Sequence, residues 1–173
     1  TISCVSSPGS SFPGSVCSNA PVVTSPFTAT AQNTACYGND YTNASTGSCG
    51  TLYESGEDRV YAYSASGPEC LNISLTKGST SWIGYQVYSG CPGTAGTSCL
   101  CSRSRARPLS GSFAIPAAGT YYIVVNHRNS IETWSKNPIA FTVGNFDYYD
   151  FSTAATQAYG DNQVLKLGSY CIY

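Results

Sequence analysis

The stretch Arg59–Thr76, RVYAYSASGPECLNISLT, decides the fold. Its first part alternates Tyr61 and Tyr63 with smaller residues, and its second part alternates Leu71, Ile73 and Leu75 with polar ones. Gly and Pro separate the two parts. A period of two places alternate side chains on opposite faces of a strand. The stretch therefore predicts two strands, Arg59–Ala65 and Cys70–Thr76, each with one buried face.

Further short runs of the same kind lie on both sides of this stretch, each bounded by Gly, Pro, Asn or Ser. They are Val22–Phe27, Trp82–Ser89, Gly111–Ile115, Thr120–Asn126, Ile139–Val143 and a final run, Val164–Tyr173. Short strands at this spacing are typical of an antiparallel β-sandwich of the jelly-roll or immunoglobulin-like type. No twelve-residue segment shows a helical stripe, although 147–161 is compatible with one short helical turn. We expect a Ser/Pro/Gly-rich extension over 1–21, a sandwich over 22–145 and a Tyr-rich extension over 146–173.

The composition points to an exported protein. Nine cysteines in 173 residues need an oxidising compartment. Methionine is absent, so we expect Thr1 to follow a removed signal peptide and the protein to be extracellular or on the cell surface. Charged residues make up only 10% and the net charge is −1, which argues against nucleic acid as a partner. No apolar run has the roughly 18 residues needed to span a membrane.

The odd number of cysteines implies a free thiol or a bond to another molecule. All nine are candidates for disulfides: Cys4, Cys17, Cys36, Cys49, Cys70, Cys91, Cys99, Cys101 and Cys171. The glycine-rich turn over 90–97 favours a local bond from Cys91 to Cys99 or Cys101. The Cys99-Leu100-Cys101 spacing also allows a metal clip, but zinc sites usually have two to four residues between cysteines, so disulfide bonding is favoured.

The middle of the chain resembles a known family. The resemblance rests on Cys49-Gly50, on Asp58 just before the aromatic strand, on the pair Cys91 and Cys99, and on the turn and strand Ala118–Tyr122, AGTYY. Over residues 17–143 the chain resembles the bacterial pre-peptidase C-terminal domain, a secreted β-sandwich. The resemblance implies a jelly-roll-like sandwich with an accessory or adhesive role and no catalytic residues. Family members usually follow a catalytic domain, and the Tyr-rich segment after residue 143 extends beyond the usual end of the domain.

Some relatives bind calcium, which would make Asp40, Glu57 and Asp58 the candidate ligands. Calcium takes six to eight oxygen ligands, and no dense acidic loop surrounds these three residues. We therefore expect no cofactor and no metal.

Catalytic patterns are missing from the sequence. His127 is the single histidine, and no G-x-S-x-G nucleophile elbow accompanies it. The acids are scattered, so no pair is placed for glycoside hydrolysis. We expect a protein that is not an enzyme.

Two surface features suggest partners. Arg103, Arg105 and Arg107 would share one face of an extended segment, where they would contact an acidic surface or protect a sheet edge. Asn43 and Asn72 lie in N-x-S triplets and are candidate glycosylation sites. Covalent or bound glycans are therefore expected partners.

The hypothesis that combines these features is a subunit of an extracellular fibre that assembles with itself. A terminal strand of one copy would join the sheet of the next, with main-chain hydrogen bonds supplying the affinity. The favoured donor is the last strand, with Val164 at its start and Leu165, Leu167, Cys171 and Tyr173 on one face. The alternative is a carbohydrate-binding or adhesive module of a larger secreted protein, with Trp134, Tyr148 and Tyr149 stacking on sugars.

Overall fold

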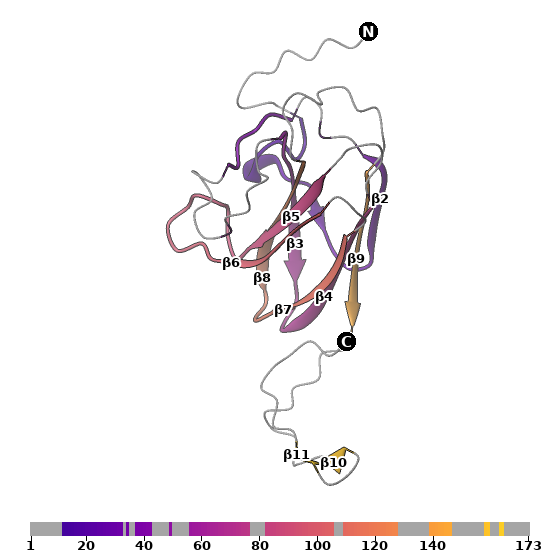
Figure 1. Cartoon of the computed structure of the whole chain (residues 1–173). Helices are drawn as coiled ribbons and strands as arrows, with labels where there is room; N and C mark the ends of the chain where they lie inside the picture. The colour runs from indigo at the N-terminus through magenta and orange to yellow at the C-terminus, as the bar shows by residue number, and fades with distance from the viewer. Residues whose placement is uncertain are drawn as a thin grey trace.

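The fold is a two-layer, all-β sandwich (Figure 1). The computed structural model describes residues 12–32, 34, 37–42, 49, 56–76, 82–105, 109–127, 139–146, 158–159 and 163–164, with the backbone alone for 30–32, 105, 127, 139–146, 158–159 and 163–164. One sheet has the order β1-β3-β8-β5-β6 and the other β2-β9-β4-β7, while β10 and β11 form a separate pair. The strands are β1 (Val22–Val23), β2 (Phe27–Gln32), β3 (Arg59–Ala65), β4 (Glu69–Thr76), β5 (Ile83–Tyr88), β6 (Cys99–Arg105), β7 (Leu109–Ile115), β8 (Gly119–His127), β9 (Ile139–Phe146), β10 (Ala158–Tyr159) and β11 (Gln163–Val164), with a 3-10 helix, η1 (Cys17–Asn19), before them.

The main core lies between the two sheets and follows the alternation in the sequence. One face of β3 contributes Tyr61 and Tyr63, and one face of β4 contributes Leu71, Ile73 and Leu75. Alternate residues of β5, β7 and β8 complete it: Ile83, Tyr85, Val87, Leu109, Phe113, Ile115, Tyr121, Ile123 and Val125. The predicted sandwich and its core-facing pattern are confirmed.

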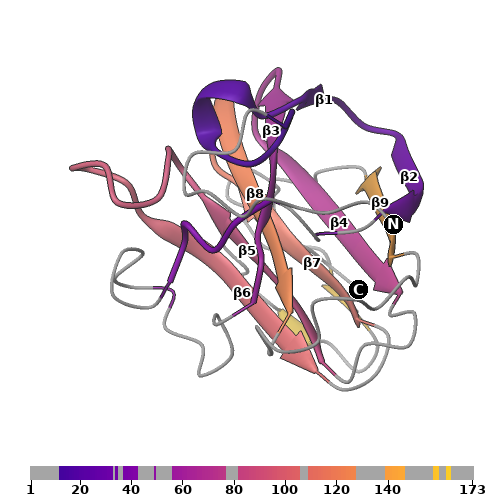
Figure 2. The same ribbon diagram turned by 90° about the horizontal axis from the view of Figure 1, so that it is seen from above.

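A second, smaller core covers the outer face of the five-stranded sheet. Val60, Tyr88 and Val124 point away from the main core, yet they are buried beneath Tyr41 and Cys49. The helix η1 lies beside β3 and β8 in the same region (Figure 2). We call the segments that lie over this face, residues 12–21, 37–42 and 49, the cover. Because of the cover, all six residues of β5 are buried.

The predicted single strand Val22–Phe27 is wrong, because the chain changes sheets within it. Val22 and Val23 pair in parallel with Ala62 and Tyr63, whereas Phe27 pairs in the antiparallel sense with Val143 of the other sheet. Pro26 lies between them, after a cis Ser25–Pro26 peptide bond. Proline has no N–H to donate to a ladder, so the strand is interrupted there.

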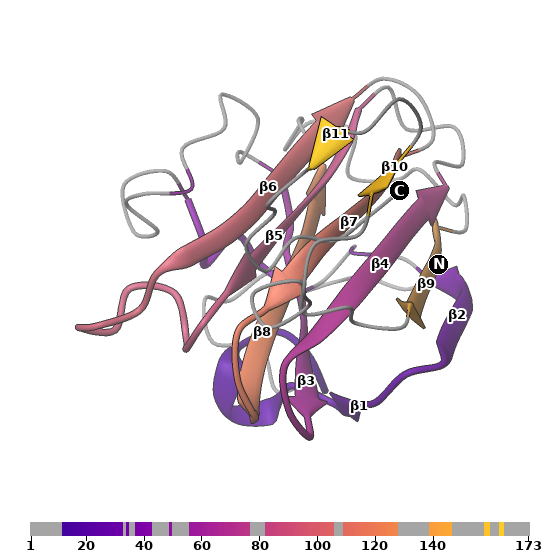
Figure 3. The same ribbon diagram turned by 90° about the horizontal axis from the view of Figure 1, so that it is seen from below.

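The strand β6 was not among the predicted strands. It forms one edge of the five-stranded sheet, pairing with β5 from Ile83–Arg105 to Tyr88–Cys99, with an irregularity between Val87 and Tyr88 (Figure 3). The loop between β5 and β6 (residues 89–98) projects beyond the sheet in the same view. Among the residues that the structure describes, no helix is long and apolar enough to cross a membrane.

The predicted terminal strand is described only at its start. Val164 belongs to β11 and pairs with Ala158 of the same chain. Leu165, Leu167, Cys171 and Tyr173 lie outside the described residues, and so does most of the segment 147–161.

Candidate binding site

A tight turn at residues 12–21 brings the first described residues against the sandwich. The Asn19 side-chain oxygen accepts hydrogen bonds from the backbone N–H groups of Gly14 (3.2 Å) and Val16 (3.0 Å). The carbonyl of Gly14 accepts from Val60 N–H at 2.7 Å, and the carbonyl of Pro21 accepts from Ala62 N–H at 3.0 Å. Gly14 has φ +95°, and a Cβ there would lie 2.8 Å from the Val60 oxygen, so the turn needs glycine.

Four aromatic rings and one guanidinium group form a continuous stack at the start of β3. Phe12 and Tyr37 have ring centroids 5.9 Å apart, and Phe27 and Tyr61 are 5.7 Å apart. The Arg59 guanidinium carbon lies between the two pairs, 5.0 Å from the Tyr37 centroid and 5.2 Å from the Tyr61 centroid. A cation over an aromatic ring contributes about 0.5–2 kcal/mol. We call these five residues the rim stack.

The outer end of the rim stack is open to solvent. Phe12 is 52% exposed, whereas Tyr61, on the inner side of Arg59, is buried in the main core. Within the described part of the chain, Phe12 and Val22 are the two exposed large hydrophobic residues. Burial raises the pKa of Tyr61, while Arg59 lowers it and Tyr37 raises it further. The rim stack therefore presents one exposed ring, that of Phe12, at its outer end.

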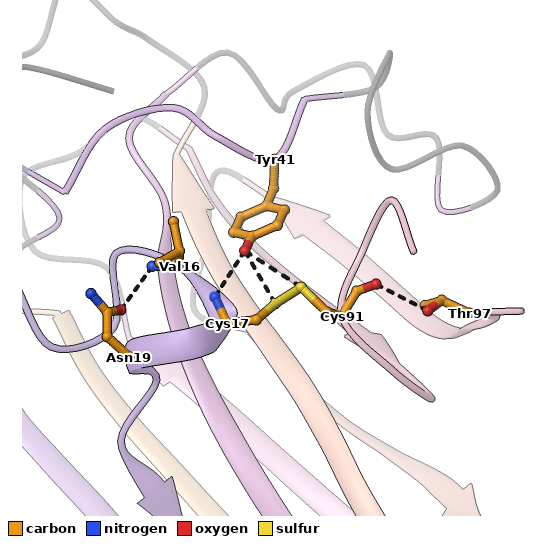
Figure 4. Close-up of a disulfide and its surroundings, with 6 residues drawn as sticks. All are labelled: Val16, Cys17, Asn19, Tyr41, Cys91 and Thr97. Atoms are coloured by element: carbon orange, nitrogen blue, oxygen red, sulfur yellow. Dashed lines mark hydrogen bonds between the residues drawn. A yellow bond between two sulfur atoms is a disulfide. The ribbon is translucent and has the colours of Figure 1, made fainter. Parts of the chain in front are cut away.

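The disulfide Cys17–Cys91 ties this region to the β5–β6 loop, with a Cα–Cα distance of 5.9 Å (Figure 4). The Tyr41 hydroxyl accepts a hydrogen bond from Cys17 N–H at 2.9 Å. It donates toward Cys17 Sγ at 3.1 Å and lies 3.7 Å from Cys91 Sγ. Burial is the main cause that raises the pKa of Tyr41, and the charges of Asp40 and Asp58 act in the same direction.

Of the three acids that were candidates for calcium, Asp58 holds the cover in place through hydrogen bonds. Asp58 is fully buried; its Oδ2 accepts from Tyr41 N–H at 2.8 Å and its own N–H donates to the Gly38 carbonyl at 2.7 Å. Burial raises the pKa of Asp40. No group of three or more His, Cys, Asp or Glu side chains that could hold a metal ion occurs among the described residues, which include Asp40, Glu57 and Asp58. Calcium binding by Asp40, Glu57 and Asp58 stays an untested prediction.

The predicted local disulfide from Cys91 to Cys99 or Cys101 is wrong. Cys91 bonds to Cys17, 74 residues away, and Cys99 bonds to Cys49, 50 residues away. Each of these cysteines in the β5–β6 hairpin thus fastens a different segment of the cover. Cys70 is also disulfide-bonded, and Cys4, Cys36 and Cys171 lie outside the described residues.

Cys101 is a free thiol rather than a disulfide partner. It packs against the main core beside Val87, whereas Cys99 packs on the outer face of the same sheet. Burial raises the pKa of the Cys101 thiol more than Arg103 and Tyr85 lower it. The predicted alternative of a half-buried free cysteine therefore applies here, and a thiol of this kind is a poor nucleophile.

The other predicted residues do not join the rim stack. Asn72 lies in β4, where its Nδ2 donates to Ser112 Oγ at 3.1 Å, and Asn43 lies outside the described residues. His127 ends β8, and Arg103 is exposed on the edge strand β6. Trp134, Tyr148 and Tyr149, the aromatics expected to stack on sugars, lie outside the described part of the chain.

Sequence reasoning missed the rim stack. Phe12 lies in a Ser/Pro/Gly-rich segment, and Tyr37 lies in a short run of polar and small residues, YGND, so neither belongs to a periodic pattern. The available signal was Arg59, a cation that opens the strongest alternating strand and so occupies the same face as Tyr61 and Tyr63. A charged side chain on the face of a strand that points to the core is unfavourable unless another group contacts it, so Arg59 indicated that aromatic or acidic side chains lie near the start of this strand.

Comparison with known proteins finds only solved structures of low similarity. No family model and no curated protein matches the chain. Among solved structures, the chain is similar to the pre-peptidase C-terminal domain of a collagenase from Bacillus anthracis, with TM-score 0.44 and 11% identity over 72% of this chain and 93% of that one. It is also similar to PliG, a periplasmic inhibitor of g-type lysozyme, from Aeromonas hydrophila (TM-score 0.41, 15% identity, 73% of this chain and 98% of that one) and from Salmonella Typhimurium (TM-score 0.34, 10% identity, 73% and 98%). The domain class that the sequence resembled is thus among these structures, and at such low identity the likeness concerns the strand arrangement alone.

Proposed function

We propose that the protein is a non-enzymatic binding module that works outside the cytosol and holds a carbohydrate chain on the rim stack. The observation that carries the proposal is the exposed ring of Phe12, held in place by Tyr37 and Arg59. Small-ligand sites are typically lined by aromatic side chains with a few polar groups. An exposed ring offers a flat apolar face to the C–H groups of a sugar.

The charges around the rim stack favour a neutral sugar. Asp40, Glu57 and Asp58 lie in the two loops that position Tyr37 and Arg59, and the whole chain has a net charge of −1. The net negative charge of the chain disfavours an anionic polysaccharide or a nucleic acid.

The compartment follows from the disulfides. Cys17–Cys91 and Cys49–Cys99 would not persist in a reducing cytosol. A module on the outside of the cell, or in a periplasm, meets polysaccharides as its commonest polymer surface.

The test is affinity electrophoresis through gels that contain hydroxyethylcellulose, laminarin, xylan or mannan. We expect at least one polysaccharide to retard the wild type, Phe12→Trp to be retarded equally or more, and Phe12→Ala and Phe12→Leu to run freely. The Leu variant separates ring stacking from general apolar contact. Val22→Ala is the matched control, because Val22 is the other exposed large hydrophobic residue, at 72%. Retardation that survives Phe12→Ala would remove the rim stack from the proposal, and no retardation of the wild type would remove carbohydrate binding.

Fibre assembly is the second candidate. The strands β1 and β6 form the edges of one sheet, and β2 and β7 form those of the other. An edge is where a donor strand from another copy would pair. The carbohydrate proposal ranks first because the start of the expected donor, Val164, pairs within its own chain. Negative-stain electron microscopy of the non-reduced protein separates the two, since filaments with a repeat of one sandwich require assembly and dispersed particles exclude it.

Asn72 is the proposed glycosylation site among the described residues. It lies on the outer face of the four-stranded sheet, opposite Gly144, a residue with no side chain to obstruct a glycan. The intact mass of the native protein before and after Asn72→Gln tests this assignment.

A further inference from the structure

The two described disulfides differ in how easily a thiol can reach them. Cys49 is only 4% exposed and lies within the second core. Its partner Cys99 is partly exposed at the edge of that core, and so are both Cys17 and Cys91. Thiol–disulfide exchange needs a thiolate to approach a sulfur atom. Access therefore favours reduction of Cys17–Cys91, in which both cysteines are partly exposed, over Cys49–Cys99, in which only Cys99 is.

The Tyr41 hydroxyl adds a chemical difference. It donates toward Cys17 Sγ at 3.1 Å, closer than to Cys91 Sγ at 3.7 Å (Figure 4). If a thiolate attacks Cys91 Sγ, the leaving group is the Cys17 thiolate, which this hydrogen bond stabilises. A better leaving thiolate departs faster.

Cys17 lies in the middle of the turn that carries Phe12. The turn meets β3 through the hydrogen bonds from Val60 N–H to the Gly14 carbonyl and from Ala62 N–H to the Pro21 carbonyl. The disulfide is the covalent bond that holds the described part of this turn to the β5–β6 loop. Without it, the turn is held by noncovalent contacts alone, among them these two backbone hydrogen bonds, the hydrogen bond from Cys17 N–H to the Tyr41 hydroxyl and the ring contact of Phe12 with Tyr37.

We infer that Cys17–Cys91 is a reducible latch on the carbohydrate-binding site, an inference that rests on the proposed function. The co-reactant is a dithiol reductant. Its thiolate attacks Cys91 Sγ, the bond to Cys17 breaks, and Cys17 leaves as a thiolate that takes up a proton. The second thiol of the reductant then attacks the mixed disulfide and releases Cys91 as a thiol. The reductant ends as a disulfide, and two electrons and two protons pass to the protein.

Reduction of the native protein by graded dithiothreitol tests the latch directly. The thiols that form are trapped by alkylation and assigned by peptide mass spectrometry. We expect Cys17 and Cys91 to be labelled at a reductant concentration about tenfold below that for Cys49 and Cys99. In parallel, hydrogen exchange at the Val60 and Ala62 amides accelerates, while exchange at Ile123 in the main core stays slow. Simultaneous labelling, or labelling of Cys49 and Cys99 first, overturns the inference.

Tyr41→Phe isolates the effect of the hydroxyl. It keeps the ring in the second core and removes both the hydrogen bond to Cys17 Sγ and the acceptor for Cys17 N–H. Because the leaving Cys17 thiolate loses its hydrogen bond, we expect opening of Cys17–Cys91 to slow about threefold or more, and hydrogen exchange at Val60 and Ala62 in the oxidised variant shows whether the turn itself has loosened. An unchanged rate would remove the leaving-group argument and leave access as the sole cause.

Paired double variants connect the latch to binding. Cys17→Ser with Cys91→Ser should weaken retardation by polysaccharide about tenfold, because Phe12 loses its covalent anchor. Cys49→Ser with Cys99→Ser is the matched control, since it removes the other bond to the same hairpin, and its retardation should stay within about twofold of the wild type. Equal loss in both variants overturns the latch.

If the wild type binds no polysaccharide, the proposed function fails, while the order of labelling and the exchange at Val60 and Ala62 still decide the latch. If the control variant does not fold, the order of labelling in the wild type decides alone.

Discussion

The two sheets of this sandwich differ in how far their outward-facing side chains are exposed to solvent. On the four-stranded sheet, most outward residues of β4 and β7 are polar or small and at least partly exposed, among them Asn72, Ser74 and Ser112, whereas the outward Cys70 is buried. On the five-stranded sheet, the outward residues Val60, Tyr88 and Val124 are buried under the cover. The same strand alternation therefore produces one sheet that meets solvent through hydroxyl and amide groups and one whose outer face is partly buried under the cover. The difference teaches that Cys17–Cys91 and Cys49–Cys99 fasten the cover to the five-stranded sheet, and the proposed binding site lies at one end of that cover.

A charge placed on each outer face should show this contrast most strongly. Val124→Asp buries a carboxylate beneath the cover, and we expect it to lower the free energy of unfolding by about 4 kcal/mol or to prevent folding. Ser74→Asp on the open face should change it by no more than about 0.5 kcal/mol. Urea unfolding of both variants measures the difference, and similar losses would contradict the contrast.

Removal of the more buried disulfide should come next in size. Cys49→Ser with Cys99→Ser releases a loop of 50 residues, and the free energy of unfolding should fall by about 2–4 kcal/mol. Thermal unfolding of the oxidised proteins checks this value. A loss below about 1 kcal/mol would mean that packing alone holds the cover on the sheet.

A methyl group at Gly14 should loosen the cover by a smaller amount. Gly14→Ala puts a side chain at φ +95° and 2.8 Å from the Val60 oxygen, so a loss of about 1–3 kcal/mol is expected. Gly67→Ala is the control, because nothing lies within 4 Å of its Cβ position. Chemical denaturation should leave Gly67→Ala within about 0.5 kcal/mol of the wild type, and equal losses would show that the turn tolerates a side chain.

The smallest expected effect is a dependence on pH at Asp40. Burial raises its pKa in the folded state above the value in the unfolded chain, so the ionised carboxylate disfavours folding at neutral pH. Asp40→Asn should therefore be slightly more stable than the wild type at pH 7, and the gain should shrink as pH falls through the pKa of Asp40. Unfolding curves from pH 3 to pH 7 test the sign, and a gain that grows toward low pH would contradict it.

The parts of the fold that the sequence could predict are those with a local physical cause. Alternation of Tyr61 and Tyr63, and of Leu71 and Ile73, follows from the two-residue period of a strand, and the structure places these residues in the core. The division of Val22–Phe27 between two sheets depends on what each half meets in three dimensions, and a period of two carries no such information. Pro26 was the one feature of this run that indicated an interruption, since proline lacks the N–H that a continuous hydrogen-bond ladder needs.

The disulfides and the rim stack depend on topology, and the sequence could not supply them. Cys91 and Cys99 are neighbours along the chain, but they hold different segments of the cover. Phe12 meets Tyr37 and Arg59 only after the turn at Gly14 has docked on β3. Contacts between segments without a periodic pattern give no signal in a single sequence.

The pairing of Cys17 with Cys91 has a consequence for how the chain matures during export. Three other cysteines, Cys36, Cys49 and Cys70, lie between them in the sequence, so a chain oxidised in order of its emergence would form non-native bonds first. The segment that leaves the translocation channel early must wait, reduced, for a hairpin that emerges 74 residues later. Correct maturation therefore requires either a β-sandwich that assembles before oxidation or a disulfide isomerase that edits the early bonds.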